Sequence, residues 1–110
     1  MNRYDIAQYV DSIAQDIMAE REYWEADELH DVAHEHADSS QYVIYYAQAH
    51  EFVQALDGAE RNEAERHIAV YEMHPESYDD FAVKIAYWAL YELIMEAVTE
   101  KLEQAEAEEA

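Results

Sequence analysis

The sequence predicts an all-α fold, a compact domain of four to five helices that ends in a long C-terminal helix. The chain has 110 residues with only one Gly and one Pro, too few for the turns of a β-sandwich or β-barrel. Apolar side chains recur every three or four residues, and polar capping residues stand before several of these runs. Hydrophobic residues make up 51% of the chain, which is enough for one core at this length.

The first helix is predicted over residues 3–22, with Asn2 as its N-cap. Its apolar stripe consists of Ile6, Tyr9, Val10, Ile13 and Ile17. A second helix is predicted over residues 26–37, with Leu29, Val32 and Ala33 facing inward. The residues 38–40, Asp-Ser-Ser, then predict a break and a new N-cap.

A third helix is expected to run from this cap through Tyr42 and Phe52 and to stop at Gly58, since glycine adopts a left-handed C-cap without a steric penalty. Residues 60–71 have a helix-forming composition, and their thin apolar stripe offers Ile68 and Tyr71 as anchors. That helix is expected to end near Pro75, because proline cannot continue a helix.

Ser77 and Asp80 resemble a capping box at the start of the last helix. About 28 helical residues at about 1.5 Å each would reach roughly 40 Å, so this helix is expected to protrude or to pair with a second copy. Its stripe consists of Phe81, Ile85, Trp88, Met95, Val98 and Leu102, widened by Tyr87, Tyr91 and Ile94. A single acidic helical domain is expected over residues 1–102, and the acidic tail over 103–110 is expected to fray because it lacks apolar anchors.

The net charge of the chain limits the classes of partner that it can bind. There are 27 Asp and Glu against 6 Lys and Arg, a formal net charge of −21. This disfavours direct binding to nucleic acid or to anionic membranes, since both require Lys and Arg, and a partner chosen by electrostatics is expected to be basic. The chain has no Cys, no signal-peptide core and no run of about 18 apolar residues, so a cytoplasmic location is predicted.

Carboxylates recur at helical spacing in three stripes. These are Asp16 and Glu20; Glu28, Asp31, Glu35 and Asp38; and Glu92, Glu96, Glu100 and Glu103. The middle stripe places four charges along about 15 Å of helix axis. Duplex DNA carries one charge per about 3.4 Å on each strand, so two or three such stripes side by side approach its charge density. We predict that these ten residues bind a partner as substitutes for phosphates, with an acidic surface kept for solubility as the alternative.

The histidine-rich segment is the main candidate for catalysis. His30, Asp31 and His34 form a His-Asp-x-x-His run with the spacing of a helical zinc site. A zinc enzyme also needs a third ligand and a substrate cleft, and the remaining histidines outside this segment are isolated. Acidic pairs occur throughout the chain and no Ser stands in a Gly-rich elbow. We therefore predict no enzyme, no metal and no cofactor, and a metal-dependent helical enzyme is the least favoured alternative.

One segment resembles a known family. It reads Leu29-His30-Asp31-Val32-Ala33-His34 and then Ala37-Asp38, after Arg21-Glu22-Tyr23 and before Tyr45-Tyr46-Ala47. Residues 21–47 thereby resemble the central part of the Ocr-like antirestriction DNA-mimic proteins of podophages, and the length, charge and acidic end agree with that family. The acidic tail is shorter here, and Arg61, Arg66, Lys84 and Lys101 interrupt the later surface.

The resemblance implies an all-helical homodimer whose carboxylates imitate the phosphates of bent duplex DNA in the groove of a host restriction enzyme. It also implies that His30 and His34 serve packing, because that family does not depend on metal. We expect a phage-encoded DNA mimic in the host cytoplasm that inhibits a basic DNA-binding defence protein of a restriction, CRISPR or similar system. The alternative is a small acidic helical adaptor that binds a basic protein through an apolar helix face.

Overall fold

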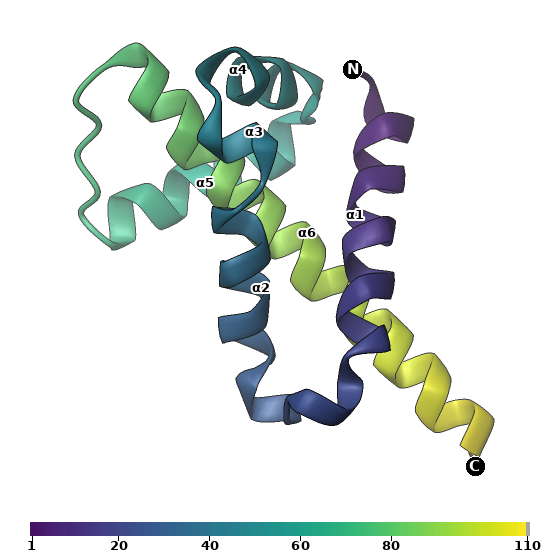
Figure 1. Ribbon diagram of the computed structural model, residues 1–110. Coiled ribbons are helices and arrows are strands. Elements are labelled where there is room, and N and C mark those ends of the chain that lie inside the picture. The colour runs from purple at the N-terminus through teal and green to yellow at the C-terminus, as the bar shows by residue number, and fades with distance from the viewer. Residues whose placement is uncertain (110) are drawn as a thin grey trace.

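The structure, a computed structural model that describes residues 1–109, confirms the all-helical prediction. The chain is 84% helical, and no strand occurs within those residues. Its α-helices are α1 (Arg3–Ala19), α2 (Leu29–Asp38), α3 (Gln41–Ile44), α4 (Tyr46–Ala55), α5 (Gly58–Val70) and α6 (Tyr78–Glu109) (Figure 1). Two short 3₁₀ turns, η1 (Arg21–Tyr23) and η2 (Ala26–Glu28), connect α1 to α2.

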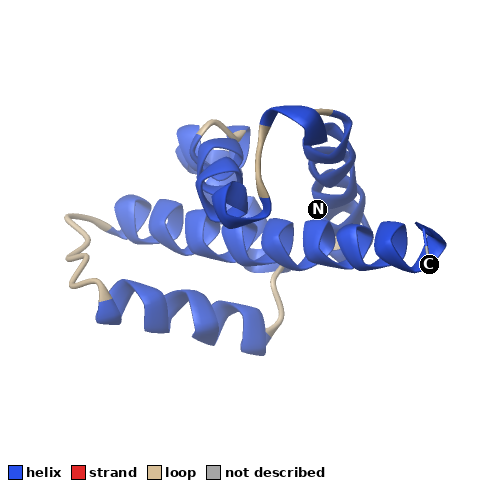
Figure 2. Ribbon diagram, turned by 90° about the horizontal axis from the view of Figure 1, so that it is seen from below, coloured by secondary structure: helices blue, strands red, loops and turns tan. Residues whose placement is uncertain are grey.

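The long helix α6 is the centre of the fold, and each of the other five α-helices packs against it. In Figure 2, α5 lies on one side of α6 and the remaining helices lie on the other. Helix α6 has 32 residues, which at about 1.5 Å per residue gives about 48 Å. The longest dimension of the molecule is also 48 Å, so α6 spans its whole length.

A single apolar core surrounds the first two thirds of α6. Its largest fully buried side chains are Phe52, Ile6, Ile17, Ile85, Leu90, Ile94 and Val98. Three small residues of α6, Ala82, Ala86 and Ala89, are also buried and allow neighbouring helices to approach closely. Because helices cover α6 on several sides, its buried residues are not confined to one stripe.

The N-terminus of α1 forms as predicted. The Asn2 side chain accepts a hydrogen bond from the Asp5 N–H at 2.9 Å, and the Asp5 carboxylate accepts one from the Asn2 N–H at 3.0 Å. The predicted end at residue 22 is wrong, because α1 stops at Ala19. Here the buried Trp24 folds back, and its indole N–H donates to the Ile17 carbonyl at 2.9 Å, which satisfies an acceptor at the helix end.

The predicted second helix, residues 26–37, divides into η2 and α2. The Glu28 carboxylate accepts from the Glu25 N–H at 2.9 Å, and the Glu28 N–H donates to the Glu25 carbonyl at 2.9 Å, so the chain tightens into a 3₁₀ turn before α2 begins. The predicted break after Asp38 is confirmed, and the Ser40 hydroxyl accepts from the Tyr42 N–H at 3.2 Å as the N-cap of α3.

The predicted third helix is wrong in two respects. It is broken at Tyr45, whose backbone is extended (φ −107°, ψ 125°), into α3 and α4. Gly58 does not cap its C-terminus but is the first residue of α5, and its φ is not positive. The reason is Asp57, whose side chain accepts from the Glu60 N–H at 2.8 Å and thereby favours a helix start at this point.

Helix α5 ends in a left-handed cap at a residue other than glycine. Glu72 has φ 52°, the Met73 N–H donates to the Ile68 carbonyl at 3.0 Å, and the Glu72 N–H donates to the Ala69 carbonyl at 3.2 Å. This pair of hydrogen bonds is a Schellman motif, in which glycine is the favoured residue at the position of Glu72. Of the two predicted anchors, Ile68 is buried, whereas Tyr71 is 61% exposed.

We therefore expect Glu72→Gly to stabilise the protein by about 1 kcal/mol, because glycine removes the steric cost of the left-handed conformation. The free energy of unfolding in urea would measure this gain. Glu72→Gln is the matched control, since it removes the same charge and keeps the Cβ. An equal gain in both variants would mean that relief of charge repulsion, rather than backbone strain, is responsible.

The start of α6 agrees with the prediction, since the Ser77 hydroxyl accepts from the Asp80 N–H at 3.0 Å. The helix continues through Glu109, so residues 103–109 are helical where the sequence predicted fraying, while residue 110 lies outside the described residues. In Figure 1 the last turns of α6 extend beyond the other helices. None of the helices in the described part of the chain combines the length and apolar character needed to cross a membrane.

Candidate acidic interface

The predicted stripe on α2 lies on the outer side of that helix. Leu29, Ala33 and Ala37 are buried and hold α2 against the core. The stripe residues alternate with them at helical spacing on the opposite side, and all four are exposed: Glu28, Asp31, Glu35 and Asp38. Asp31, Glu35 and Asp38 are therefore presented to solvent from a helix whose other face is fixed by packing, and Glu28 precedes them as the last residue of η2.

Most of these carboxylates have no cationic partner. Asp31 forms an exposed ion pair with His30 at 3.4 Å, and a Glu28 oxygen accepts from the Glu25 N–H at 2.9 Å. Glu35 and Asp38 form no ion pair among the described residues. The α2 stripe thus keeps nearly all of its charge available to an external partner.

The chain around α2 is also free of basic residues. Residues 22–60 contain ten Asp and Glu and no Lys or Arg. The nearest preceding cation, Arg21, lies over the Trp24 ring at 4.5 Å and donates to the Trp24 carbonyl at 2.5 Å, so its charge is held against the protein. No Lys or Arg side chain of this segment is therefore present to neutralise the stripe.

The α1 stripe lies near the same end of the molecule. Helices α1 and α2 run in opposite directions, and η1 and η2 join them at the lower end in Figure 1. Asp16 and Glu20 stand at the end of α1 and are exposed, close along the chain to the start of α2 with Glu28 and Asp31. The acids at this turn, with Glu22, Glu25 and Asp27 between the two helices, therefore form one acidic end, from which α2 leads toward Glu35 and Asp38.

The α6 stripe lies elsewhere. Glu96, Glu100 and Glu103 are exposed, and Glu96 and Glu100 line a groove between α6, α1 and α5. Helix α2 instead meets α6 through His34, which stacks on Tyr91 with ring centroids 4.0 Å apart. Helix α2 and the α6 stripe therefore lie on different sides of α6.

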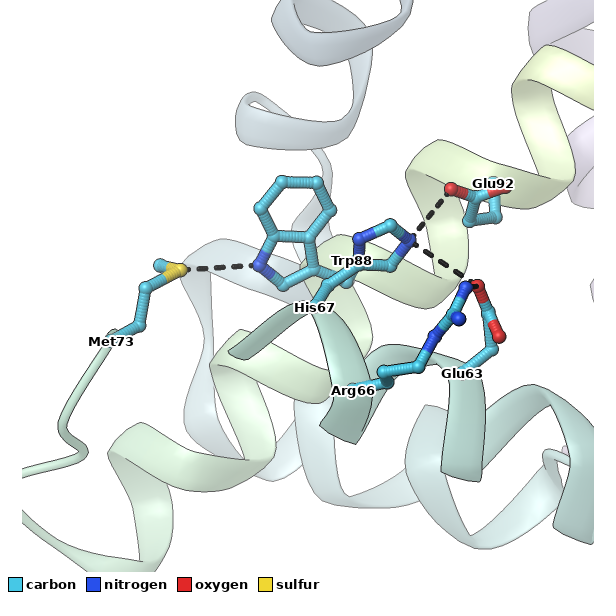
Figure 3. Close-up of polar contacts among 6 residues, drawn as sticks. All are labelled: Glu63, Arg66, His67, Met73, Trp88 and Glu92. Carbon is cyan, nitrogen blue, oxygen red and sulfur yellow. Dashed lines mark hydrogen bonds and ion pairs between the residues drawn. The ribbon is translucent and has the colours of Figure 1, made fainter. Parts of the chain in front are cut away.

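Glu92 differs from the rest of its stripe because it is engaged within the protein. It is half-buried, and its carboxylate accepts from His67 Nε2 at 2.8 Å, while Glu63 lies 3.8 Å from the same nitrogen (Figure 3). His67 also stacks on Trp88 with ring centroids 4.6 Å apart. Glu92 thus ties α6 to α5, which leaves it less suited to an external partner than the other predicted residues.

The basic residues that depart from the family pattern do not form a basic patch. Each of them pairs with a carboxylate: Arg61 with Glu65, Arg66 with Glu63, Lys84 with Asp80 and Lys101 with Asp11. Arg3 pairs with Glu60. Ion pairs at the surface contribute little to stability. The carboxylates that these basic residues neutralise all lie outside the α2 stripe.

Three histidines fasten other helices to α6. His34 of α2 shares a hydrogen bond with the Tyr87 hydroxyl, His50 of α4 donates to Asp79 at 2.6 Å, and His67 of α5 donates to Glu92. His30 does not join His34 in a common site, because it is exposed and pairs with Asp31. Within residues 1–109 no group of three His, Asp or Glu side chains is close enough to hold a metal ion.

His34 gives the fold a pH-dependent contact. Burial lowers the pKa of His34, the charge of neighbouring His30 lowers it further, and Asp31 acts in the opposite direction. On the α6 side the Tyr87 and Tyr91 rings stack on His34, and the Tyr87 hydroxyl shares a hydrogen bond with its Nδ1. Because the folded state disfavours the protonated ring, this contact stabilises the protein above the unfolded-state pKa and loses its effect as pH falls through the lower folded-state pKa.

We therefore expect His34→Gln to flatten the pH dependence of the free energy of unfolding between about pH 7 and about pH 5, where histidine titrates. Urea titrations at several pH values would measure it, and the difference between variant and parent removes the background of titrating carboxylates. His74→Gln, at an exposed position, is the control and should leave the parent curve unchanged. Parallel curves for parent and His34→Gln would contradict the assignment.

Comparisons of the chain with models of protein families, with curated proteins and with solved structures return no match. The likeness of residues 21–47 to the Ocr family therefore stays a prediction.

Proposed function

We propose that this protein is a DNA mimic that inhibits a basic DNA-binding protein of a host defence system by occupying its DNA groove. The observation that supports the proposal most is the outer face of α2 and its N-cap, with four exposed carboxylates beside a helix face that is packed into the core. Their average spacing along the axis is about 5 Å, the same order as the spacing of phosphates along a DNA strand. The neighbouring acids of α1, η1 and η2 widen this surface.

The mechanism needs no catalytic step. Carboxylates placed against a basic groove attract the same Lys and Arg side chains that hold DNA, and long-range attraction increases the rate of encounter. Counterions are released when the two charged surfaces meet, which favours binding as it does for DNA itself. A rigid helical support holds the charges in place before the partner arrives and reduces the entropy lost on binding.

Capture from a host lysate followed by competition with duplex DNA tests the proposal. The captured protein should bind either DNA or this protein but not both, and added salt should weaken the complex, because screening reduces both interactions. Simultaneous, independent binding of DNA and this protein to the partner would rule out occlusion.

The second candidate, an acidic adaptor, is favoured by one specific observation. Ile44, Tyr45 and Tyr46 form an apolar run at the junction of α3 and α4, with 55%, 60% and 58% of their surfaces exposed. This run lies at the end of the molecule opposite the turn between α1 and α2 (Figure 1). If the adaptor is correct, Tyr45→Ser with Tyr46→Ser should abolish capture of the partner, and the complex should persist at high salt.

A homodimer is part of the same proposal, because the family resemblance implies one and the last turns of α6 extend beyond the rest of the molecule. Half-buried Leu102 lies near the start of this part of the helix. Sedimentation equilibrium would measure the mass in solution, and a monomer at all concentrations would contradict this part of the proposal.

A further inference from the structure

A groove crosses the molecule where α1 and the first turn of α5 meet α6. Its volume is about 320 Å³, at the lower end of the range of about 300 to 1,000 Å³ for binding pockets. The floor is apolar and is formed by Ile6, Val10, Leu93 and Ala97. The rim is acidic and is formed by Asp11, Glu60, Glu96 and Glu100.

The protein's own cations engage the two ends of this rim but not its middle. Arg3 donates to Glu60 at 2.6 Å at one end, and Lys101 pairs with Asp11 at 3.0 Å at the other. Glu96 and Glu100 form no ion pair among the described residues. They are four residues apart on α6, which brings their Cβ atoms within about 6 Å and makes the two carboxylates repel each other.

A ligand that fits this groove must both cover an apolar floor and pair with two unneutralised carboxylates. A lysine or arginine side chain has an apolar stem and a cationic head, and arginine loses less hydration when it is bound. Arg3 already places a guanidinium against a carboxylate of the same rim. A neutral apolar ligand would leave the carboxylates unpaired, and a simple cation would not use the floor.

We propose that this groove receives an arginine side chain of a basic protein, with its stem along Leu93 and Ala97 and its guanidinium between Glu96 and Glu100. The inference rests on the proposed function for the identity of that protein, a DNA-binding partner. It adds a second type of contact to the mimic, since a side chain held in a groove contributes specific affinity that screened surface carboxylates do not. It also explains how the α6 stripe contributes although it lies away from the α2 stripe.

The probe is a capped, alanine-based helical peptide that carries two arginines four residues apart, titrated into ¹⁵N-labelled protein. We expect saturable shifts of backbone amides in residues 6–11 and 93–100. Glu96→Gln with Glu100→Gln should weaken binding about tenfold, as expected for loss of a buried anchor contact. The matched control, Glu72→Gln with Glu76→Gln, changes the net charge equally at two exposed positions outside the groove and the predicted stripes, and should leave the affinity within about twofold.

A second pair of variants leaves the charge unchanged. Ala7 lines the groove and is exposed, so Ala7→Phe should fill it and weaken the peptide about tenfold. Ser12 is exposed on α1 and does not line this groove, so Ser12→Phe should leave the affinity unchanged. Thermal unfolding of each variant establishes that it is folded.

Shifts spread over the whole acidic surface, or equal losses from the Glu72/Glu76 and Glu96/Glu100 double variants, would overturn the groove proposal. Because this titration uses only the peptide, its outcome is independent of the DNA competition experiment. If the peptide does not bind in the groove, the competition experiment with DNA still tests the DNA-mimic proposal. If this protein does not compete with DNA, the peptide titration still tests the arginine site.

Discussion

Replacing Glu28 and Glu35 with Gln, and Asp31 and Asp38 with Asn, is expected to weaken inhibition of the basic partner by about 30-fold to about 1,000-fold. Four screened contacts of about 0.5 to 1 kcal/mol each sum to about 2 to 4 kcal/mol, which corresponds to that range. The helix should remain folded, because the new side chains are similar in size and relieve repulsion between like charges. Each single substitution should have a small effect. An inhibition assay, with circular dichroism to check folding, measures the result.

The matched control neutralises four exposed acids outside the three predicted stripes, namely Glu72, Glu76, Glu106 and Glu108. Changing each of them to Gln alters the net charge by the same four units. If arrangement matters, the control should retain most of the inhibition. Equal losses from the two quadruple variants would mean that total charge carries the effect, and the mimic would have to be abandoned in favour of non-specific attraction.

The second large effect is expected from Trp88→Ala, which should destabilise the fold by about 3 to 5 kcal/mol. Trp88 is 7% exposed and lies where α2, α5 and α6 meet (Figure 3). Its ring stacks on His67 and Tyr71, at 4.6 and 5.2 Å between centroids, and meets His34 edge-on at 5.7 Å. Its indole N–H contacts the Met73 sulfur at 3.2 Å. Removing this ring leaves a cavity between three helices.

Urea unfolding monitored by circular dichroism would measure this loss. A small domain has a stability of about 5 to 15 kcal/mol, so the variant should be marginally folded or unfolded. Tyr23→Ala is the control, because Tyr23 is 79% exposed and its removal should change stability by less than about 0.5 kcal/mol. A loss below about 1 kcal/mol for Trp88→Ala would show that the aromatic cluster is not a structural centre.

Features of the fold that depend on a few neighbouring residues could be predicted from the sequence. The caps at Asn2, Ser40 and Ser77 form as expected, because a capping side chain acts on backbone groups two or three residues away. The predicted C-cap at Gly58 is wrong because two local signals compete, and the capping box of Asp57 with Glu60 prevails over a glycine C-cap. The end of α1 depended on Trp24 reaching back seven residues to Ile17, which helical periodicity does not encode.

In the candidate site, too, relations within one helix could be predicted and relations between helices could not. Helical spacing places Asp31, Glu35 and Asp38 on one exposed face, because that relation lies within a single helix, whereas Glu28 belongs to the preceding 3₁₀ turn η2. The relation between stripes depends on how helices pack, so the separation of the α2 and α6 stripes could not be predicted. For the same reason no pattern in the sequence indicates that Glu60 of α5 and Asp11 of α1 join Glu96 and Glu100 around one groove.

The central position of α6 has a consequence for the order in which the chain folds. Helices α1, α2, α4 and α5 each bury their apolar faces against a helix that begins only at Tyr78. Isolated helices of about 10 to 17 residues are marginal in water, so these segments have no stable partner while residues 78–109 are still inside the ribosome. Folding therefore follows synthesis of the last helix instead of proceeding from the N-terminus, and nascent chains are exposed to chaperones and proteases until then.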